Sequence, residues 1–179
     1  MLGDQDAVGV IIDVQGKLAQ SMHERDALFD NLQRLVRGLK LLGIPLLWTE
    51  QYPQGLGPTI PELAALLQPS AAISKVSFSC SGCPAFRDAL RALGRRQVLL
   101  AGIEAHVCVF QTARDLAAEG FEVHVVADAV SSRRAENARL GIERMRAAGA
   151  QMTGVESALF ELMKTAEHPR FREMLQVVR

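Results

Sequence analysis

Cys108 is the side chain of this sequence that is best placed to act as a nucleophile. The apolar run Val98–Ala101 predicts a buried strand that ends near Ile103, and a helical pattern begins close to Cys108. A thiol at the start of a helix lies near unpaired N–H groups and the positive end of the helix dipole, which favour its anion. We therefore expect the pKa of Cys108 to be lowered. The alternative is that Cys108 is a small apolar side chain that fills the core.

Two charged residues could assist such a thiol. Asp13 lies at the carboxyl end of the first predicted strand, Ala7–Val14, where open α/β sheets bind ligands; the alternative is that it only caps a turn. Lys75 lies inside the third predicted strand, Ala71–Phe78. It should face a carboxylate, a site or solvent, because burying a lone ammonium is costly. Considered alone, this strand favours an ordinary exposed face for Lys75.

Strands and helices alternate along the whole chain. The predicted strands are Ala7–Val14, Ile44–Tyr52, Ala71–Phe78, Gln97–Ile103, Glu122–Ala129 and Gln151–Val155. The predicted helices are Arg25–Leu42, Pro61–Leu67, Pro84–Leu93, one that begins near Cys108, Ala135–Ala148 and Ser157–Thr165. This alternation predicts a three-layer α/β/α, Rossmann-like fold, with a six-stranded parallel sheet in the order 3-2-1-4-5-6 and helices on both faces.

Composition limits the classes of partner. A chain of 179 residues fits a single domain, residues 1–179. Its three cysteines are too few and too uneven in number for a disulfide framework, which favours a reducing compartment and hence the cytoplasm. Twenty basic residues balance twenty acidic ones, which argues against nucleic acid as a partner.

Hydropathy favours association with further copies of the chain. We see no signal peptide and no apolar run of membrane-spanning length, so we expect no membrane partner. The mean hydropathy of +0.10 and the 49% of hydrophobic residues are high for a soluble monomer. We therefore expect a homo-oligomer, a dimer or a tetramer.

Other motifs give weaker signals. Cys80 and Cys83 form C-S-G-C, the spacing of a redox dithiol or of half a zinc site, but the further ligands of a zinc site are missing. No G-x-G-x-x-G and no P-loop occurs, and the histidines have no ligand spacing: His23, His106, His124 and His168. We expect no cofactor and no metal.

Four segments of the chain together resemble a known family. They are IIDVQ at the first strand, ISKVSF around Lys75, GIEAHVCVFQTARDL around Cys108, and VVADAVSSR after the fifth strand. The chain resembles the isochorismatase-like cysteine hydrolases over about residues 7 to 165. In that family an aspartate, a lysine and a cysteine at the matching positions form a catalytic triad, which implies Asp13, Lys75 and Cys108 here.

The resemblance agrees with elementary chemistry. A thiol needs a base to take its proton and a cation to stabilise the anion, roles that fit Asp13 and Lys75. Attack on a carbonyl creates an oxyanion, for which the backbone N–H groups of Glu104 and Cys108 are the natural donors. The family also has a cis peptide bond at the position of Ile103 and Glu104. Pocket-lining residues are expected on the neighbouring segments: Gln15, Trp48, Glu50, Gln51, Tyr52, Phe78, His106 and Val107.

Two departures narrow the expected substrate. Nicotinamidases of this family carry an aspartate and histidines after the second strand that bind a metal, whereas this chain has WTEQYPQGLGPT there. Isochorismate-cleaving members lack the nucleophilic cysteine. A small amide, ureide or ester is the remaining expectation, with hydrolysis through an acyl-cysteine. The alternatives are a catalytically silent binding or oligomerising module and a thiol redox protein that uses Cys80 and Cys83.

Overall fold

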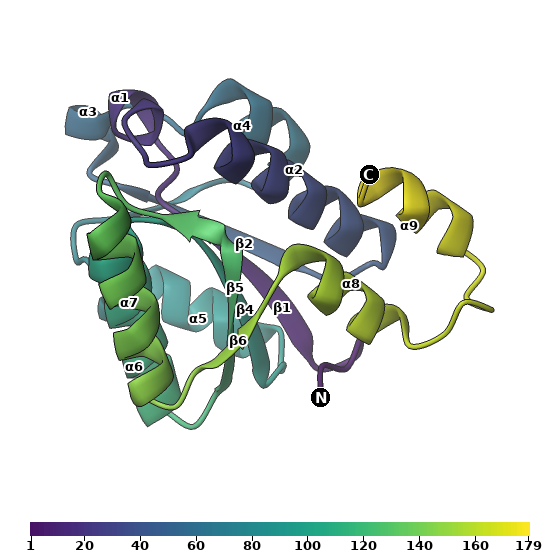
Figure 1. Ribbon diagram of the computed structural model, residues 1–179. Coiled ribbons are helices and arrows are strands. Elements are labelled where there is room, and N and C mark those ends of the chain that lie inside the picture. Colours follow the sequence, from purple (N-terminus) through teal and green to yellow (C-terminus); the bar gives the residue numbers. More distant parts are fainter.

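The computed structural model describes residues 1–179 and contains one six-stranded sheet. All its strand pairs are parallel, and its order is β3-β2-β1-β4-β5-β6, which confirms the predicted topology (Figure 1). The strands are β1 (Ala7–Ile12), β2 (Leu46–Gln51), β3 (Ile73–Lys75), β4 (Gln97–Ile103), β5 (Glu122–Ser131) and β6 (Gln151–Thr153).

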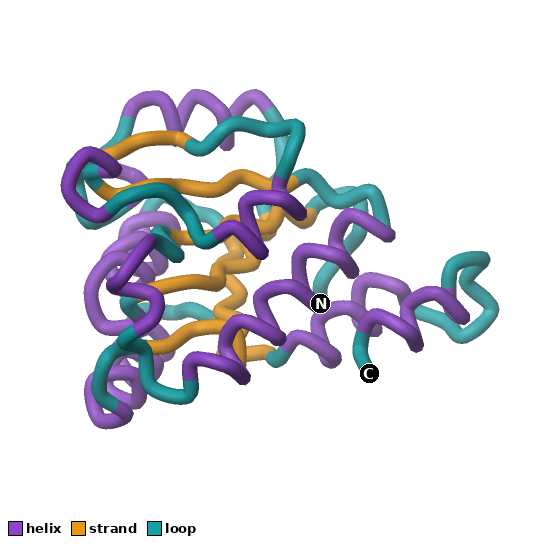
Figure 2. The backbone as a smooth tube through the Cα atoms, turned by 90° about the horizontal axis from the view of Figure 1, so that it is seen from above, coloured by secondary structure: helices purple, strands orange, loops and turns teal.

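Helices cover both faces of this sheet, and Figure 2 shows them on either side of the strands. One layer contains α2 (Arg25–Leu41), α4 (Pro61–Leu67), α8 (Val155–Met163) and α9 (Phe171–Val177). The other contains α5 (Pro84–Ala92), α6 (Phe110–Ala118) and α7 (Ala135–Ala147). Short turns complete the chain: α1 (Gly16–Gln20), α3 (Pro53–Leu56), the 3₁₀ turn η1 (Cys80–Gly82) and the π-helical turn η2 (Ala105–Val109).

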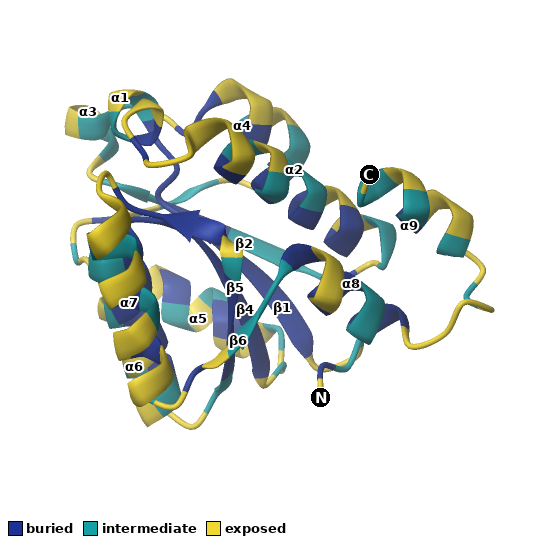
Figure 3. Ribbon diagram, in the orientation of Figure 1, coloured by how far each residue is buried: buried dark blue, intermediate teal, exposed yellow.

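The hydrophobic core has two parts because side chains alternate across each strand. From β1, Ile11 packs under α2, whereas Val10 and Ile12 pack under α5 and α6. Both β1 and β4 are buried along their whole length, as the unbroken apolar runs predict. Figure 3 shows the buried faces of the helices turned toward the sheet. The central strands therefore hold their carboxyl ends rigidly at one edge.

Several element boundaries differ from the prediction. The predicted third strand was too long, because pairing ends at Lys75 and the chain then bends away. The helix near Cys108 begins earlier, with the π-helical turn at Ala105. The prediction missed α1, α3 and α9, which are too short to show a clear period. No helix is both long and apolar enough to span a membrane.

Candidate active site

Asp13 and Lys75 meet at the carboxyl edge of the sheet, although 61 residues separate them in sequence. Lys75 Nζ donates a hydrogen bond of 2.6 Å to Asp13 Oδ2. The pair is an ion pair with exposed side-chain fractions of 0% for Lys75 and 2% for Asp13. The expectation that Lys75 lies on an exposed face, which strand β3 considered alone favours, was therefore wrong. The ammonium points inward because a buried carboxylate lies there to receive it.

The carboxylate of Asp13 is held from two directions. Its Oδ2 accepts from Lys75, and its Oδ1 accepts a 2.7 Å hydrogen bond from Thr49 Oγ1. Asp13 follows β1 directly and has a positive φ of 54°, a conformation that Asp adopts more readily than most residues. Sequence reasoning missed Thr49. Its signal was a polar residue inside the otherwise apolar start of β2, LLWT.

The ammonium of Lys75 has three further acceptors besides Asp13. They are Gln51 Oε1 at 2.8 Å and the backbone carbonyls of Ser77 and Phe78 at 3.1 Å and 3.0 Å. These carbonyls explain why β3 ends at Lys75, since the chain must turn back to present them to the ammonium. The lysine side chain thus fixes the conformation of the loop that follows it.

Cys108 is 7% exposed and lies close enough to Asp13 and Lys75 for both charges to act on its thiol. Burial raises the pKa of Cys108 to about 12, and the negative charge of Asp13 adds to this, against a lowering by Lys75. The prediction of a lowered pKa was therefore wrong. It considered only the local helix start, whereas loss of solvation and a carboxylate distant in sequence have the larger effect. At neutral pH the resting group is a thiol.

The loop between β4 and the cysteine turn is organised by Glu104. The peptide bond between Ile103 and Glu104 is cis, at the position that the resemblance implies. The carbonyl of Glu104 accepts hydrogen bonds from the amides of Val107 and Val109, which form the first turn around Cys108. Its carboxylate is buried and pairs with Arg133, a residue that sequence reasoning did not single out.

Comparison with known proteins identifies the family of the chain. The sequence model of the isochorismatase domain matches residues 7–157. The chain belongs to the isochorismatase family. A curated family relative, isochorismatase domain-containing protein 2 of Danio rerio, is 38% identical over 99% of this chain and 89% of its own length.

Solved structures of this family superpose on nearly the whole chain. A structure described as the MAR1 ribonuclease of Caenorhabditis elegans has a TM-score of 0.93 and 35% identity, and the match covers 99% of this chain and 91% of that one. The YcaC protein of Escherichia coli, described as an octameric hydrolase of unknown specificity, has a TM-score of 0.89 and 26% identity, with 99% and 95% covered.

Three of the predicted pocket residues have structural roles in this family member. Gln15 is fully buried and donates to the carbonyls of Gln51 and Gly57, so it fastens the chain after β2. Trp48 lies in the core layer under α2 and α4, and its indole N–H donates to Ser70 Oγ. Both side chains are engaged in these contacts, and a role for Gln15 or Trp48 in lining a pocket stays a prediction. Glu50 accepts two hydrogen bonds from Thr59.

The other predicted pocket residues lie nearer to the surface of the site. Gln51 contacts the ammonium of Lys75, while Tyr52 and Phe78 are exposed. His106 and Val107 are half-buried in the cysteine turn, and His106 Nδ1 is hydrogen-bonded to Ser132 Oγ at 2.9 Å. These residues stay candidates for contact with a substrate.

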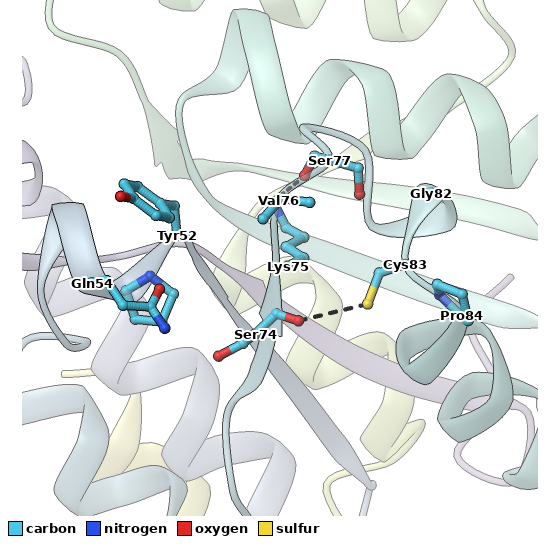
Figure 4. A pocket seen from close by; sticks show the side chains of 10 residues that line it. Tyr52, Gln54, Ser74, Lys75, Val76, Ser77, Gly82, Cys83 and Pro84 are labelled. Atoms are coloured by element: carbon cyan, nitrogen blue, oxygen red, sulfur yellow. Dashed lines mark hydrogen bonds between the residues drawn. The ribbon is translucent and has the colours of Figure 1, made fainter.

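A cavity of about 290 Å³ opens beside β3 (Figure 4). In this view Tyr52 and Gln54 lie on one side of the strand and Cys83 on the other. The thiol of Cys83 is directed at the Ser74 carbonyl, 3.7 Å away. Cys80 is completely buried, and burial raises its pKa to about 11. Both observations count against the redox alternative, which requires exposed thiols of low pKa.

Proposed function

We propose that this protein is a cysteine-dependent hydrolase of a small amide, ureide or ester. The observation that carries the proposal is the buried Asp13–Lys75 ion pair beside the buried thiol of Cys108. A buried ion pair contributes little to stability compared with well-packed apolar residues. Its presence next to a potential nucleophile is therefore better explained by chemistry than by folding, and this argues against a silent binding module.

In the first step Asp13 acts as the general base. It takes the thiol proton of Cys108 while Sγ attacks the carbonyl carbon of the substrate, so that a C–S bond forms and the carbonyl electron pair moves to oxygen. The positive charge of Lys75 stabilises the negative charge that develops on Sγ while the proton is on Asp13. The backbone N–H groups of Glu104 and Cys108 are the proposed donors to the oxyanion.

Asp13 then passes the thiol proton to the leaving group and later supplies a proton from water to the sulfur. When the tetrahedral adduct collapses, the C–N or C–O bond breaks and Asp13 protonates the leaving group, which leaves a thioester on Cys108. Water then attacks the thioester as Asp13 takes its proton, and a second collapse releases the acid and restores the thiol. A neutral thiol at rest suits this sequence, because the buried site then contains only the balanced charges of Asp13 and Lys75.

We also infer assembly of several copies in a reducing compartment, the cytoplasm. The Escherichia coli relative is described as octameric. Three large apolar side chains that follow β2 and β3 in the chain are exposed: Tyr52, Val76 and Phe78. All three cysteines are free. Light scattering should give a multiple of the chain mass of 19.5 kDa.

The decisive experiment is to trap the acyl-enzyme. Incubation with p-nitrophenyl acetate and rapid acid quench should add one acetyl group, which peptide mapping places on Cys108. In Cys108→Ala the adduct should be absent and hydrolysis should fall by about 10³-fold or more, because the thiol that forms the acyl intermediate is missing. Cys83→Ala, which removes a thiol from the β3 cavity, is the matched control and should behave like the parent protein.

The substrate class requires a panel of amides, ureides and esters. A short RNA belongs in the panel, because the Caenorhabditis elegans relative is described as a ribonuclease. If Cys108→Ala kept more than about a tenth of the hydrolytic rate, a covalent cysteine mechanism would be excluded.

A further inference from the structure

The segment Ser131–Arg133 at the end of β5 has no part in the chemistry above. It joins pieces of chain that are far apart in sequence. Ser131 Oγ donates to the carbonyl of His23, at 2.7 Å. The amide of His23 donates to the carbonyl of Ser132, at 2.9 Å. The segment is therefore fastened on one side to the turn before α2.

On its other side the segment holds the loop that carries Cys108. Ser132 Oγ is hydrogen-bonded to His106 Nδ1. The backbone amide of Arg133 donates to Glu104 Oε2 at 3.0 Å. The side-chain Nε of Arg133 donates to Glu104 Oε1 at 3.1 Å. Arg133 Nη2 lies 3.1 Å from the same Oε1. A backbone N–H and a guanidinium group thus bind one carboxylate.

This pairing differs from an ordinary surface ion pair. The carboxylate side of the pair is buried, with 8% of the Glu104 side chain exposed, against 60% for Arg133. Glu104 also uses its carbonyl to accept the amides of Val107 and Val109. The side chain and the carbonyl of Glu104 are therefore both held, which restricts the position of the residue that carries the proposed oxyanion donor.

The backbone of the same loop has no freedom to move toward α7. A Cβ atom at Gly141 would lie 2.6 Å from the carbonyl carbon of Ala105, so this helix already touches the loop backbone. Arg133 therefore holds Glu104 from one side while α7 supports Ala105 from the other.

We propose that Arg133 is a positioning residue for the oxyanion site and acts through the carboxylate of Glu104. It holds the Glu104 amide where the oxyanion develops, and it contacts no reacting atom itself. This inference rests on the proposed hydrolase function. Because a small misplacement of a donor costs a large part of its effect, loss of the Arg133 side chain should slow acyl transfer specifically.

The test compares two reactions of the same thiol at one pH. Acylation of Cys108 by p-nitrophenyl acetate passes through a tetrahedral oxyanion, whereas alkylation by iodoacetamide is a direct displacement that forms none. In Arg133→Met, acylation should fall about 10- to 100-fold, while alkylation should stay within about twofold of the parent protein. Arg134→Met is the matched control, because the neighbouring Arg134 side chain makes no hydrogen bond or ion pair.

Two milder variants keep the test informative if Arg133→Met unfolds. Arg133→Lys retains the charge but lacks the guanidinium geometry, and Glu104→Gln retains an acceptor oxygen, so both should show smaller losses confined to acylation. Equal slowing of acylation and alkylation, or no slowing of either, would overturn the inference. If Cys108 of the parent protein is alkylated but never acylated, the proposed hydrolase function fails and the inference fails with it.

Discussion

The two sides of the candidate site are both buried and yet differ in where the charge lies. On the β1–β3 side, Asp13 and Lys75 form an ion pair whose remaining hydrogen-bonding capacity is met by Thr49, Gln51 and two carbonyls. On the β4–α6 side, burial and the charge of Asp13 keep Cys108 neutral by raising its pKa to about 12. In the resting protein the charges are therefore on Asp13 and Lys75. The sulfur of Cys108 becomes negatively charged only when Asp13 takes the thiol proton.

The largest expected effect on stability comes from breaking the Asp13–Lys75 ion pair. Lys75→Met keeps the apolar stem but leaves the Asp13 carboxylate buried without its cation, which should lower the free energy of unfolding by about 3–5 kcal/mol. Urea denaturation measures this loss.

The chain offers a matched control for that measurement. Lys164 Nζ lies 2.6 Å from Asp4 Oδ1, the same distance as in the buried pair, but its side chain is 57% exposed and that of Asp4 is 38% exposed. Lys164→Met should therefore change the free energy of unfolding by less than about 1 kcal/mol. Similar losses in the two variants would show that burial does not distinguish the pairs.

A smaller effect should follow from removing one hydrogen bond of the pair. Thr49→Val preserves the shape of the side chain and leaves Asp13 Oδ1 without its 2.7 Å donor, which should cost about 1–3 kcal/mol of unfolding free energy. The thermal midpoint should fall accordingly, and Thr49→Ser should restore most of it. A Thr49→Val protein that melts like the parent would mean that Oδ1 finds another donor.

The smallest expected effect concerns the two buried thiols, Cys80 and Cys108. Folding raises the pKa of Cys80 to about 11 and that of Cys108 to about 12, from an ordinary 9.0, so the folded protein keeps both thiol protons where the unfolded chain loses them. Stability should therefore fall as pH rises above 9, by about 1 kcal/mol per thiol at pH 10.

The contribution of the thiols is isolated by difference. Thermal midpoints of the parent protein and of Cys80→Ala/Cys108→Ala between pH 8 and 10 separate it from other groups that titrate in this range. Parallel pH dependences in the two proteins would show that the cysteines are not protected as the geometry implies.

Much of the fold was predictable because its signals are local. The apolar runs of β1 and β4, followed by turn residues, identify central strands, and regular alternation with helices dictates a parallel sheet. Edge strands were less predictable: β3 has only three residues, and a lysine side chain sets its end. Short helices such as α9 give no clear period.

The sequence by itself placed Asp13 at the carboxyl end of one buried strand and Cys108 near the start of the helix after another. Lys75 joined them only through the resemblance to the family, because its own strand favoured an exposed face. Only the tertiary structure decided the resting protonation of Cys108, the inward direction of Lys75 and the pairing of Glu104 with Arg133. These depend on solvent exclusion and on charges from segments distant in the chain, and neither can be read from neighbouring residues.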